Sequence, residues 1–232
     1  DPEMSRGLGD VYKRQDMGFE NPMPVQEKVI PHLLNEDGDV IALAQTGTGK
    51  TAAFGLPVLQ RIDVKQVTPQ ALIIAPTREL CLQIGSDLSD FSKYTPDLKV
   101  LPVYGGSSIE SQIRSLKNGV HIVVATPGRL LDLIERRTVR LDNVSTVIMD
   151  EADEMLNMGF YKDVRGIIDL LKSRESLSMF SATISREVLD IGWLYQHNAA
   201  EVDVQPVQES SPKIAQYKLL TTCLLYTSPS PR

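Results

Sequence analysis

The strongest constraint on the fold of this chain is a repeated alternation between short apolar runs and amphipathic stretches. Runs such as LIIA at 72–75 and IVVA at 122–125 place apolar side chains on both faces of a strand, which favours a covered parallel sheet. Stretches such as Arg129–Arg137 and Val164–Lys172 carry apolar residues at the i, i+3 and i+4 spacing of a helix. The alternation predicts an α/β fold, a doubly wound parallel sheet with helices on both faces.

Seven strands are predicted, the last of them on a weaker pattern. They are Val40–Ala44, Ala71–Ala75, Val100–Tyr104, His121–Ala125, Val144–Met149, Ser178–Ser181 and Glu201–Val204. Polar, glycine-rich or charged clusters follow these runs: QTGTGKT, PTREL, GG, TPGR, DEAD and SAT. Because ligands in doubly wound folds bind at the carboxyl ends of the strands, we expect the clusters to form one site.

Length and charge limit the possible function classes. A chain of 232 residues, 42% of them hydrophobic, can form one large domain, since about 150 residues is a common domain size. Its 24 basic and 30 acidic residues give a net charge of −6. This balance excludes a globally basic nucleic-acid binder, although it leaves room for a local basic face.

The cysteines and histidines indicate a protein of a reducing compartment, in which these side chains form no metal centre. The two cysteines, Cys81 and Cys223, are far apart, and the three histidines show no metal-ligand spacing. No apolar run approaches the roughly 18 residues of a membrane helix, and the N-terminus lacks the apolar stretch of a signal peptide. We therefore expect a soluble cytoplasmic protein with no membrane partner.

The two ends of the chain differ in character from its middle. Residues 205–212 are polar and proline-containing and predict a linker, and 213–222 predict the start of another strand. Residues 1–15 and 223–232 fit no element, and we interpret both as tails of doubtful native origin.

A glycine-rich segment follows the first predicted strand and precedes a helical pattern. It reads Ala44, Gln45, Thr46, Gly47, Thr48, Gly49, Lys50, Thr51. Its glycines would let backbone N–H groups surround phosphates, Lys50 would reach the β- and γ-phosphates, and Thr51 would bind Mg²⁺. The alternative is a glycine-rich turn with a chance GKT, and the usual first glycine is here Ala44. The strand before and the helix after favour a phosphate loop.

An acidic pair ends the predicted strand Val144–Met149. Asp150 lies where a phosphate site needs a second partner for Mg²⁺, and Glu151 could orient and deprotonate an attacking water. The alternative is a helix N-terminus, which also favours Asp150, Glu151 and Asp153. The phosphate loop upstream favours the functional interpretation.

Taken together, these motifs resemble the N-terminal RecA-like domain of a DEAD-box RNA helicase of the bacterial kind. The motifs occur in the family's order: Gly18-Phe19-x-x-Pro22-x-x-Val25-Gln26, Ala44–Thr51, Pro76–Leu80, Gly105-Gly106, Thr126–Arg129, Asp150–Asp153 and Ser181–Thr183. The likeness runs from about Gly18 to Thr183 and continues more weakly to Thr222. It implies that 16–204 form a RecA-like P-loop NTPase domain and that 213–222 begin a second one.

The resemblance implies ATP and Mg²⁺ as cofactors and assigns roles on the ATP side. Gln26 would read the adenine edge, because an amide can both donate to it and accept from it. Phe19 would shape that loop, with plain packing as the alternative. Lys50 keeps the role given above, Asp150 would hold Mg²⁺ through water, and Glu151 would be the general base.

On the RNA side the resemblance implies sequence-independent binding of the sugar-phosphate backbone. The residues are Thr77, Arg78, Gly105, Gly106, Thr126, Gly128 and Arg129. They are types that bind phosphate and sugar; for the two arginines a structural ion pair is the alternative. Ser181, Thr183 and Asp153 would couple nucleotide state to domain closure, with helix capping as the alternative for the Ser-Ala-Thr motif.

Two departures from the family pattern concern completeness. An adenine-stacking aromatic residue upstream of Gly18 cannot be assigned, and the second RecA-like domain, the expected partner in closure, is missing. We expect the chain to be a monomer that is weakly active or inactive by itself. The rival functions are a P-loop ATPase acting on DNA or protein and a non-catalytic, nucleotide-responsive RNA-binding module.

Overall fold

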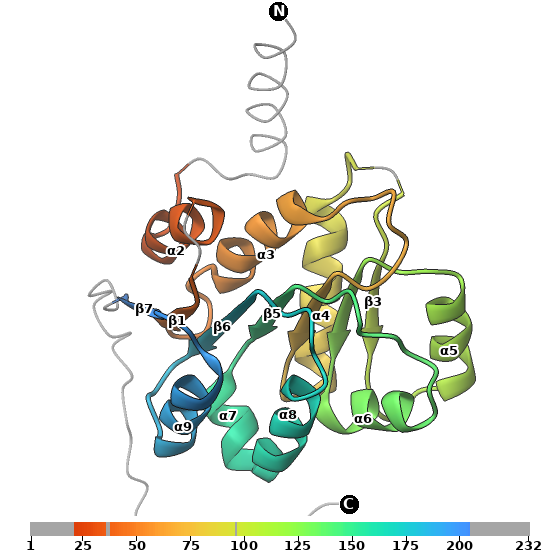
Figure 1. The fold of residues 1–232 in the computed structure, drawn as a ribbon. Coiled ribbons are helices and arrows are strands. Elements are labelled where there is room, and N and C mark those ends of the chain that lie inside the picture. The colour runs from red at the N-terminus through yellow and green to blue at the C-terminus, as the bar shows by residue number, and fades with distance from the viewer. Residues whose placement is uncertain (1–20, 36–37, 96, 205–232) are drawn as a thin grey trace, which may run out of the picture.

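A computed structural model describes residues 21–35, 38–95 and 97–204 of the chain, and one parallel sheet organises them (Figure 1). The strands are β1 (Val40–Leu43), β2 (Ala71–Ile74), β3 (Val100–Val103), β4 (Ile122–Ala125), β5 (Thr146–Met149), β6 (Ser176–Ser181) and β7 (Ala200–Asp203). Their order is β3-β4-β2-β5-β6-β1-β7, and each neighbouring pair is parallel. Because the strands are parallel, the loops after them meet at one edge of the sheet.

Helices cover both faces of this sheet (Figure 1). They are α2 (Pro24–Asn35), α3 (Lys50–Arg61), α4 (Arg78–Phe91), α5 (Ile109–Lys117), α6 (Pro127–Glu135), α7 (Ala152–Met155), the π-helical turn η1 (Leu156–Phe160), α8 (Tyr161–Ile168) and α9 (Arg186–Tyr195). Helices α2, α3 and α4 pack on one face of the sheet, and the others pack on the opposite face. One buried apolar cluster lies between the sheet and the helices on each face. The doubly wound α/β fold predicted from the sequence is confirmed.

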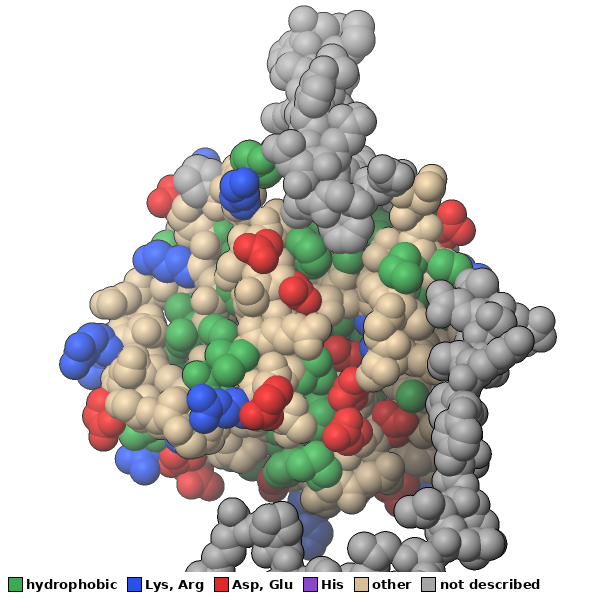
Figure 2. Space-filling view, turned by 180° about the vertical axis from the view of Figure 1, so that it is seen from behind, with side chains coloured by type: hydrophobic (Ala, Val, Ile, Leu, Met, Phe, Trp, Pro, Cys, Tyr) green, Lys and Arg blue, Asp and Glu red, His purple; other side chains and the backbone are tan. Residues whose placement is uncertain are grey.

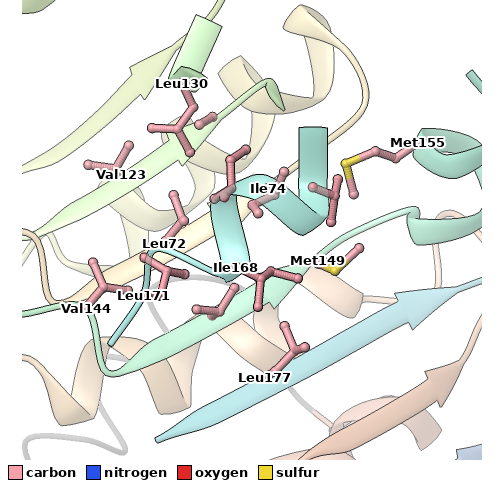
Figure 3. Close-up of a cluster of buried hydrophobic side chains, with 14 of the residues drawn as sticks. Leu72, Ile74, Val123, Leu130, Val144, Met149, Met155, Ile168, Leu171 and Leu177 are labelled. Carbon is pink, nitrogen blue, oxygen red and sulfur yellow. The ribbon is translucent and has the colours of Figure 1, made fainter. Parts of the chain in front are cut away.

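Strand β2 shows why wholly apolar runs are needed in this sheet. Its side chains alternate between the faces: Leu72 and Ile74 join the cluster under α6 and α8, and Ile73 joins the cluster under α3 and α4. Figure 3 shows Leu72 and Ile74 among the side chains of the first cluster, beside Leu130 and Ile168. Both faces are buried, so no position of the strand tolerates a polar side chain at low cost.

The seven predicted strands are all present, with bounds that differ by up to two residues. The predicted helix Arg129–Arg137 begins two residues earlier, because Pro127 occupies its first turn with a φ already suited to a helix. The predicted helix Val164–Lys172 overlaps with α8, but α8 ends at Ile168, before the predicted end. The predicted tails, the linker and the start of a further domain lie outside the described residues.

Surface composition follows the mixed charge of the sequence. Figure 2 shows the face opposite to the view of Figure 1, where Lys and Arg are scattered among acidic and apolar side chains. In the part of the chain that the structure describes, every helix is too short or too polar to cross a lipid bilayer.

Candidate functional site

The phosphate loop connects β1 to α3 at the carboxyl edge of the sheet. Gly47 and Gly49 have φ of 78° and 82°, in the left-handed region that glycine adopts without strain. The Thr48 hydroxyl donates to the Gln45 carbonyl over 2.7 Å, which closes the turn. Helix α3 then begins at Lys50, so the free N–H groups of its first turn point into the loop, as an anion site requires.

Gln26 braces this loop from α2. Its side-chain Nε2 donates to the Gly49 carbonyl over 3.2 Å, and its Oε1 accepts from the Met23 N–H over 2.9 Å. A Cβ on Gly49 would come within 2.5 Å of that Nε2, so no other residue fits there without displacing the amide. The structure thus places Gln26 against the phosphate loop, and its contact with adenine stays a prediction.

Lys50 and Asp150 form a buried pair at the centre of the site. The Lys50 Nζ lies 3.6 Å from Asp150 Oδ1, which is an ion pair but longer than a good hydrogen bond. Within the described residues this Nζ has no hydrogen-bond partner, although it is buried. Burial raises the pKa of Asp150, and the nearby Lys50 charge opposes that rise. A buried ammonium without a hydrogen-bonded acceptor is suited to an incoming anion.

Glu151 turns with the loop after β5 and adopts φ of 50°. A left-handed conformation is costly for a residue with a long side chain, by about 1 to 3 kcal/mol, and such strain concentrates at functional sites. Burial raises the pKa of Glu151 to about 7, assisted by its hydrogen bond with Glu154 and by the Asp150 charge. A carboxyl group that titrates near neutral pH is suited to accept a proton.

This pKa predicts how the stability of the ligand-free chain depends on pH. The folded protein keeps a proton on Glu151 that the unfolded chain releases above its ordinary pKa of 4.5, so stability falls as pH rises from there to about 7. Glu151→Gln cannot release this proton and so removes this loss of stability. The melting temperature of the variant minus that of the wild type should therefore be larger at about pH 8 than at about pH 4. The increase should be small because solvent screens the side chain. Equal differences at both pH values, measured by circular dichroism, would contradict this assignment.

A third wall of the site comes from α4. A cavity of about 560 Å³ is lined by the phosphate loop, the acidic pair, Met23 and Gln26 of the α2 segment, and the α4 side chains Leu80, Gln83, Asp87 and Phe91. Burial raises the pKa of Asp87, and an interaction with the Thr51 side chain opposes this rise. Asp87 thus lies near Thr51, the predicted Mg²⁺ ligand.

The Ser-Ala-Thr motif is tied to the acidic motif by a compact network. Asp153 Oδ2 accepts from both the backbone N–H and the hydroxyl of Thr183, over 2.9 and 2.7 Å. The Ser181 hydroxyl accepts from the Asp153 N–H and donates to the Thr183 carbonyl. Burial acts to raise the pKa of Asp153, but these hydrogen bonds hold it below its ordinary value. The helix cap of α9 is instead Ser185.

The predicted RNA residues follow β2, β3 and β4 at the same edge of the sheet. Thr77, Gly105, Gly106 and Thr126 lie in the loops, whereas Arg78 begins α4 and Gly128 and Arg129 lie in the first turn of α6. Thr77 caps α4 by accepting from the Leu80 N–H, and Thr126 precedes α6 without such a bond. A Cβ on Gly105 or Gly128 would meet open space, so these two glycines leave the backbone accessible. All three loops therefore present backbone or hydroxyl groups that a sugar-phosphate chain could reach.

Both RNA-side arginines contact neutral groups. The Arg78 guanidinium lies 5.0 Å from the centre of the Tyr104 ring, a cation–π contact. Arg129 donates to the Ser107 carbonyl and to the Gln112 side chain. These contacts do not neutralise either positive charge, although the Glu110 carboxylate is near enough to Arg129 to interact with it electrostatically.

Sequence reasoning missed several residues of this site. They are Met23, Gln83, Asp87, Tyr104, Gln112 and Glu154. Gln83, Asp87 and Gln112 have no signal of their own in the sequence, because only the packing of α4 and α5 in the fold brings them near the motifs. Glu154 did have a signal in the sequence, because it lies four residues after Asp150, in the short helix that follows the acidic pair. Phe19 lies outside the described residues.

The family model for the DEAD/DEAH box helicase matches residues 23–191. Among curated proteins, the chain is 45% identical to the "DEAD-box ATP-dependent RNA helicase CshA" of Bacillus cereus over 92% of this chain and 41% of that protein. It is 49% identical to the "ATP-dependent RNA helicase CshA" of Listeria monocytogenes over 87% of this chain and 38% of that protein. The chain thus spans about two fifths of the length of these relatives.

Solved structures agree with these matches. The crystal structure of a DEAD box protein from Methanococcus jannaschii gives a TM-score of 0.79 at 41% identity, covering 84% of this chain and 53% of that one. The yeast DEAD-box splicing factor Prp28 gives a TM-score of 0.78 at 33% identity, covering 83% and 48%.

Proposed function

Because this chain belongs to the DEAD/DEAH box helicase family, we propose that it is the ATP-binding half of an ATP-dependent RNA helicase. The observation that carries the proposal is the joint placement of Lys50, Asp150 and Glu151 in one cavity, beside three loops suited to a sugar-phosphate chain. In the whole protein, ATP hydrolysis would be coupled to local unwinding or remodelling of RNA. We propose a cytoplasmic monomer as its working form.

The residues present fit Mg·ATP. The N–H groups at the start of α3 and the Lys50 ammonium would hold the β- and γ-phosphates, since that ammonium has no hydrogen-bonded acceptor within the described residues. The Thr51 hydroxyl and the Asp150 carboxylate are hard oxygen ligands of the kind Mg²⁺ prefers. When bound, Mg²⁺ would offset the negative charge that develops on the phosphates.

Glu151 is the proposed general base. Its carboxylate would accept a proton from a water whose oxygen attacks the γ-phosphorus, while the bond from that phosphorus to the bridging β–γ oxygen breaks and ADP leaves. Its pKa of about 7 allows both the base and its conjugate acid to be populated at neutral pH. Glu151 follows Asp150 directly and has a strained φ of 50°, and such strain concentrates at functional sites.

Asp153, Ser181 and Thr183 are the proposed coupling group. Their hydrogen bonds join the loop after β5 to the loop after β6, so a shift of the acidic motif on nucleotide binding would move Thr183. The second RecA-like domain would meet this edge of the sheet and complete both the ATP site and the RNA groove.

A two-domain protein would test this function. Residues 21–204 can be joined to the C-terminal half of a curated relative, and ATP turnover measured with RNA, with single-stranded DNA and without nucleic acid. We expect RNA to stimulate turnover and DNA not to, and the isolated chain to hydrolyse little ATP. Stimulation by DNA alone would favour the rival DNA-dependent ATPase, and ATP binding without turnover would favour a non-catalytic module.

A further inference from the structure

One glutamine of α5 occupies a position where an apolar residue would be expected. Gln112 is the buried residue of this helix, with 6% of its surface exposed, while the apolar residues Ile109, Ile113 and Leu116 are only partly buried. A primary amide is costly to bury unless both its donor and its acceptor are used. Its place in α5 therefore indicates a specific polar task.

Each polar atom of this amide has a partner on the RNA-side loops. Its Nε2 donates to the Tyr104 carbonyl over 3.2 Å and to the Ser107 hydroxyl over 2.7 Å. Its Oε1 accepts from Arg129 Nη1 over 2.9 Å. One side chain thus joins both ends of the loop that contains Gly105 and Gly106 to Arg129 in the first turn of α6.

Both predicted RNA-binding arginines contact this loop. The Arg129 guanidinium also donates from Nη1 and Nη2 to the Ser107 carbonyl, over 3.3 Å each. Arg78 lies over the Tyr104 ring, and a Cβ added to Gly106 would be 3.5 Å from its Nη1. Both guanidinium groups therefore depend on the conformation of 104–107 for their position.

We propose that Gln112 is a positioning residue for RNA binding. It holds the loop 104–107 in one conformation and, through it, sets Arg129 and Arg78 at the spacing that a sugar-phosphate backbone meets. The proposal rests on the proposed RNA function of these loops, and it assigns no direct contact with RNA to Gln112 itself. Two adjacent glycines, one of them with φ of 80°, make this loop costly to order, so a buried clamp gives RNA a preorganised surface.

Gln112→Leu tests this role, because leucine fills a similar volume and makes none of the three contacts. A matched control is Gln70→Leu at the opposite edge of the sheet. Gln70 is also buried, with 9% exposed, and its amide bonds the Asp63 N–H, the Asp63 carbonyl and the Gln66 carbonyl over 2.8 to 2.9 Å. Ser107→Ala removes a single partner of Gln112 and serves if Gln112→Leu does not fold.

Three quantities are to be measured on the 232-residue chain and its variants. They are the affinity for a fluorescein-labelled single-stranded polyuridine, the affinity for a fluorescent ADP analogue, and hydrogen exchange of the amides in 104–108. For Gln112→Leu we expect RNA affinity to fall by about tenfold, as for the loss of one to two kcal/mol of hydrogen bonding, with ADP affinity unchanged. Exchange in the loop should accelerate. Gln70→Leu should lower the melting temperature similarly and leave RNA affinity and loop exchange unchanged.

The outcomes separate this proposal from the function on which it rests. Wild-type RNA affinity retained in Gln112→Leu, with or without faster exchange, would overturn the positioning role and leave the RNA function intact. An equal loss of RNA affinity in Gln70→Leu would reduce the effect to general destabilisation and also overturn it. Because the second domain would supply part of the RNA groove, absence of RNA binding by the wild type both as the 232-residue chain and in the two-domain protein would overturn the proposed RNA function together with this inference.

Discussion

Glu151→Gln is expected to lower the ATP turnover of the two-domain protein by about 10²- to 10⁴-fold, the usual contribution of a general base. ATP affinity should change by no more than a few fold, because the α3 N–H groups and Lys50, which are the proposed phosphate ligands, are unchanged. Glutamine keeps the size of the side chain and loses only the ability to accept a proton from water. The result would resolve binding from chemistry at this site.

The measurement is single-turnover hydrolysis beside equilibrium titration with a fluorescent ATP analogue. Glu135→Gln, at the exposed end of α6, is the control and should behave as the wild type. Unchanged turnover in Glu151→Gln would remove Glu151 from the base role. A parallel loss of turnover and affinity would instead assign it to substrate binding.

Asp39→Ala is expected to destabilise the folded chain by about 3 to 5 kcal/mol, a large part of the roughly 5 to 15 kcal/mol that holds a domain folded. The Asp39 carboxylate is buried, with 2% exposed, just before β1. Its Oδ1 accepts from the Leu177 N–H over 2.6 Å, and its Oδ2 accepts from the His197 N–H over 2.7 Å. Alanine would leave the buried Leu177 N–H and the partly buried His197 N–H without their charged acceptor.

Urea unfolding followed by circular dichroism would measure this effect. Asp39→Asn should lose most of the same free energy, since an amide has one oxygen and would turn its NH₂ group toward a backbone donor. Asp132→Ala is the control: Asp132 pairs with Arg136 on the exposed face of α6, and its loss should leave the free energy of unfolding nearly unchanged. Wild-type stability in Asp39→Ala would show that water or a shifted backbone satisfies both donors.

The conformation of the glycine-rich loop and the position of the acidic pair could be predicted because each is a local pattern with a chemical reason. Gly47 and Gly49 do take the left-handed conformations that a phosphate loop needs, and Asp150 does end a buried strand. The rival interpretation of the acidic pair as a helix start agrees only in part with the structure: α7 begins directly after the pair, at Ala152, but no side chain caps it. Lys50 and Asp150 were both named from the sequence, whereas their 3.6 Å separation is a product of the fold.

Gln112, Asp87 and Asp39 could not be predicted, because nothing in their local sequence distinguishes them from ordinary polar residues. By its local sequence, Gln112 is one of the polar residues of an amphipathic helix, and Asp87 is one of the polar residues of α4. Asp39 acts on backbone groups 138 and 158 residues away along the chain. Such partners become neighbours only when β1 is inserted between β6 and β7.

The sequence by itself determined the elements, their parallel arrangement and the edge at which the chemistry would gather, since periodicity and motif order are properties of neighbouring residues. The tertiary structure alone decided the strand order, the wall that α4 adds to the cavity around Lys50, and the hydrogen bonds that join Gln112 to Ser107 and Arg129. The physical reason is that contact energies between distant segments depend on which helices and strands pack together. A one-dimensional pattern specifies what each segment can bury, but it leaves open which partner will cover it.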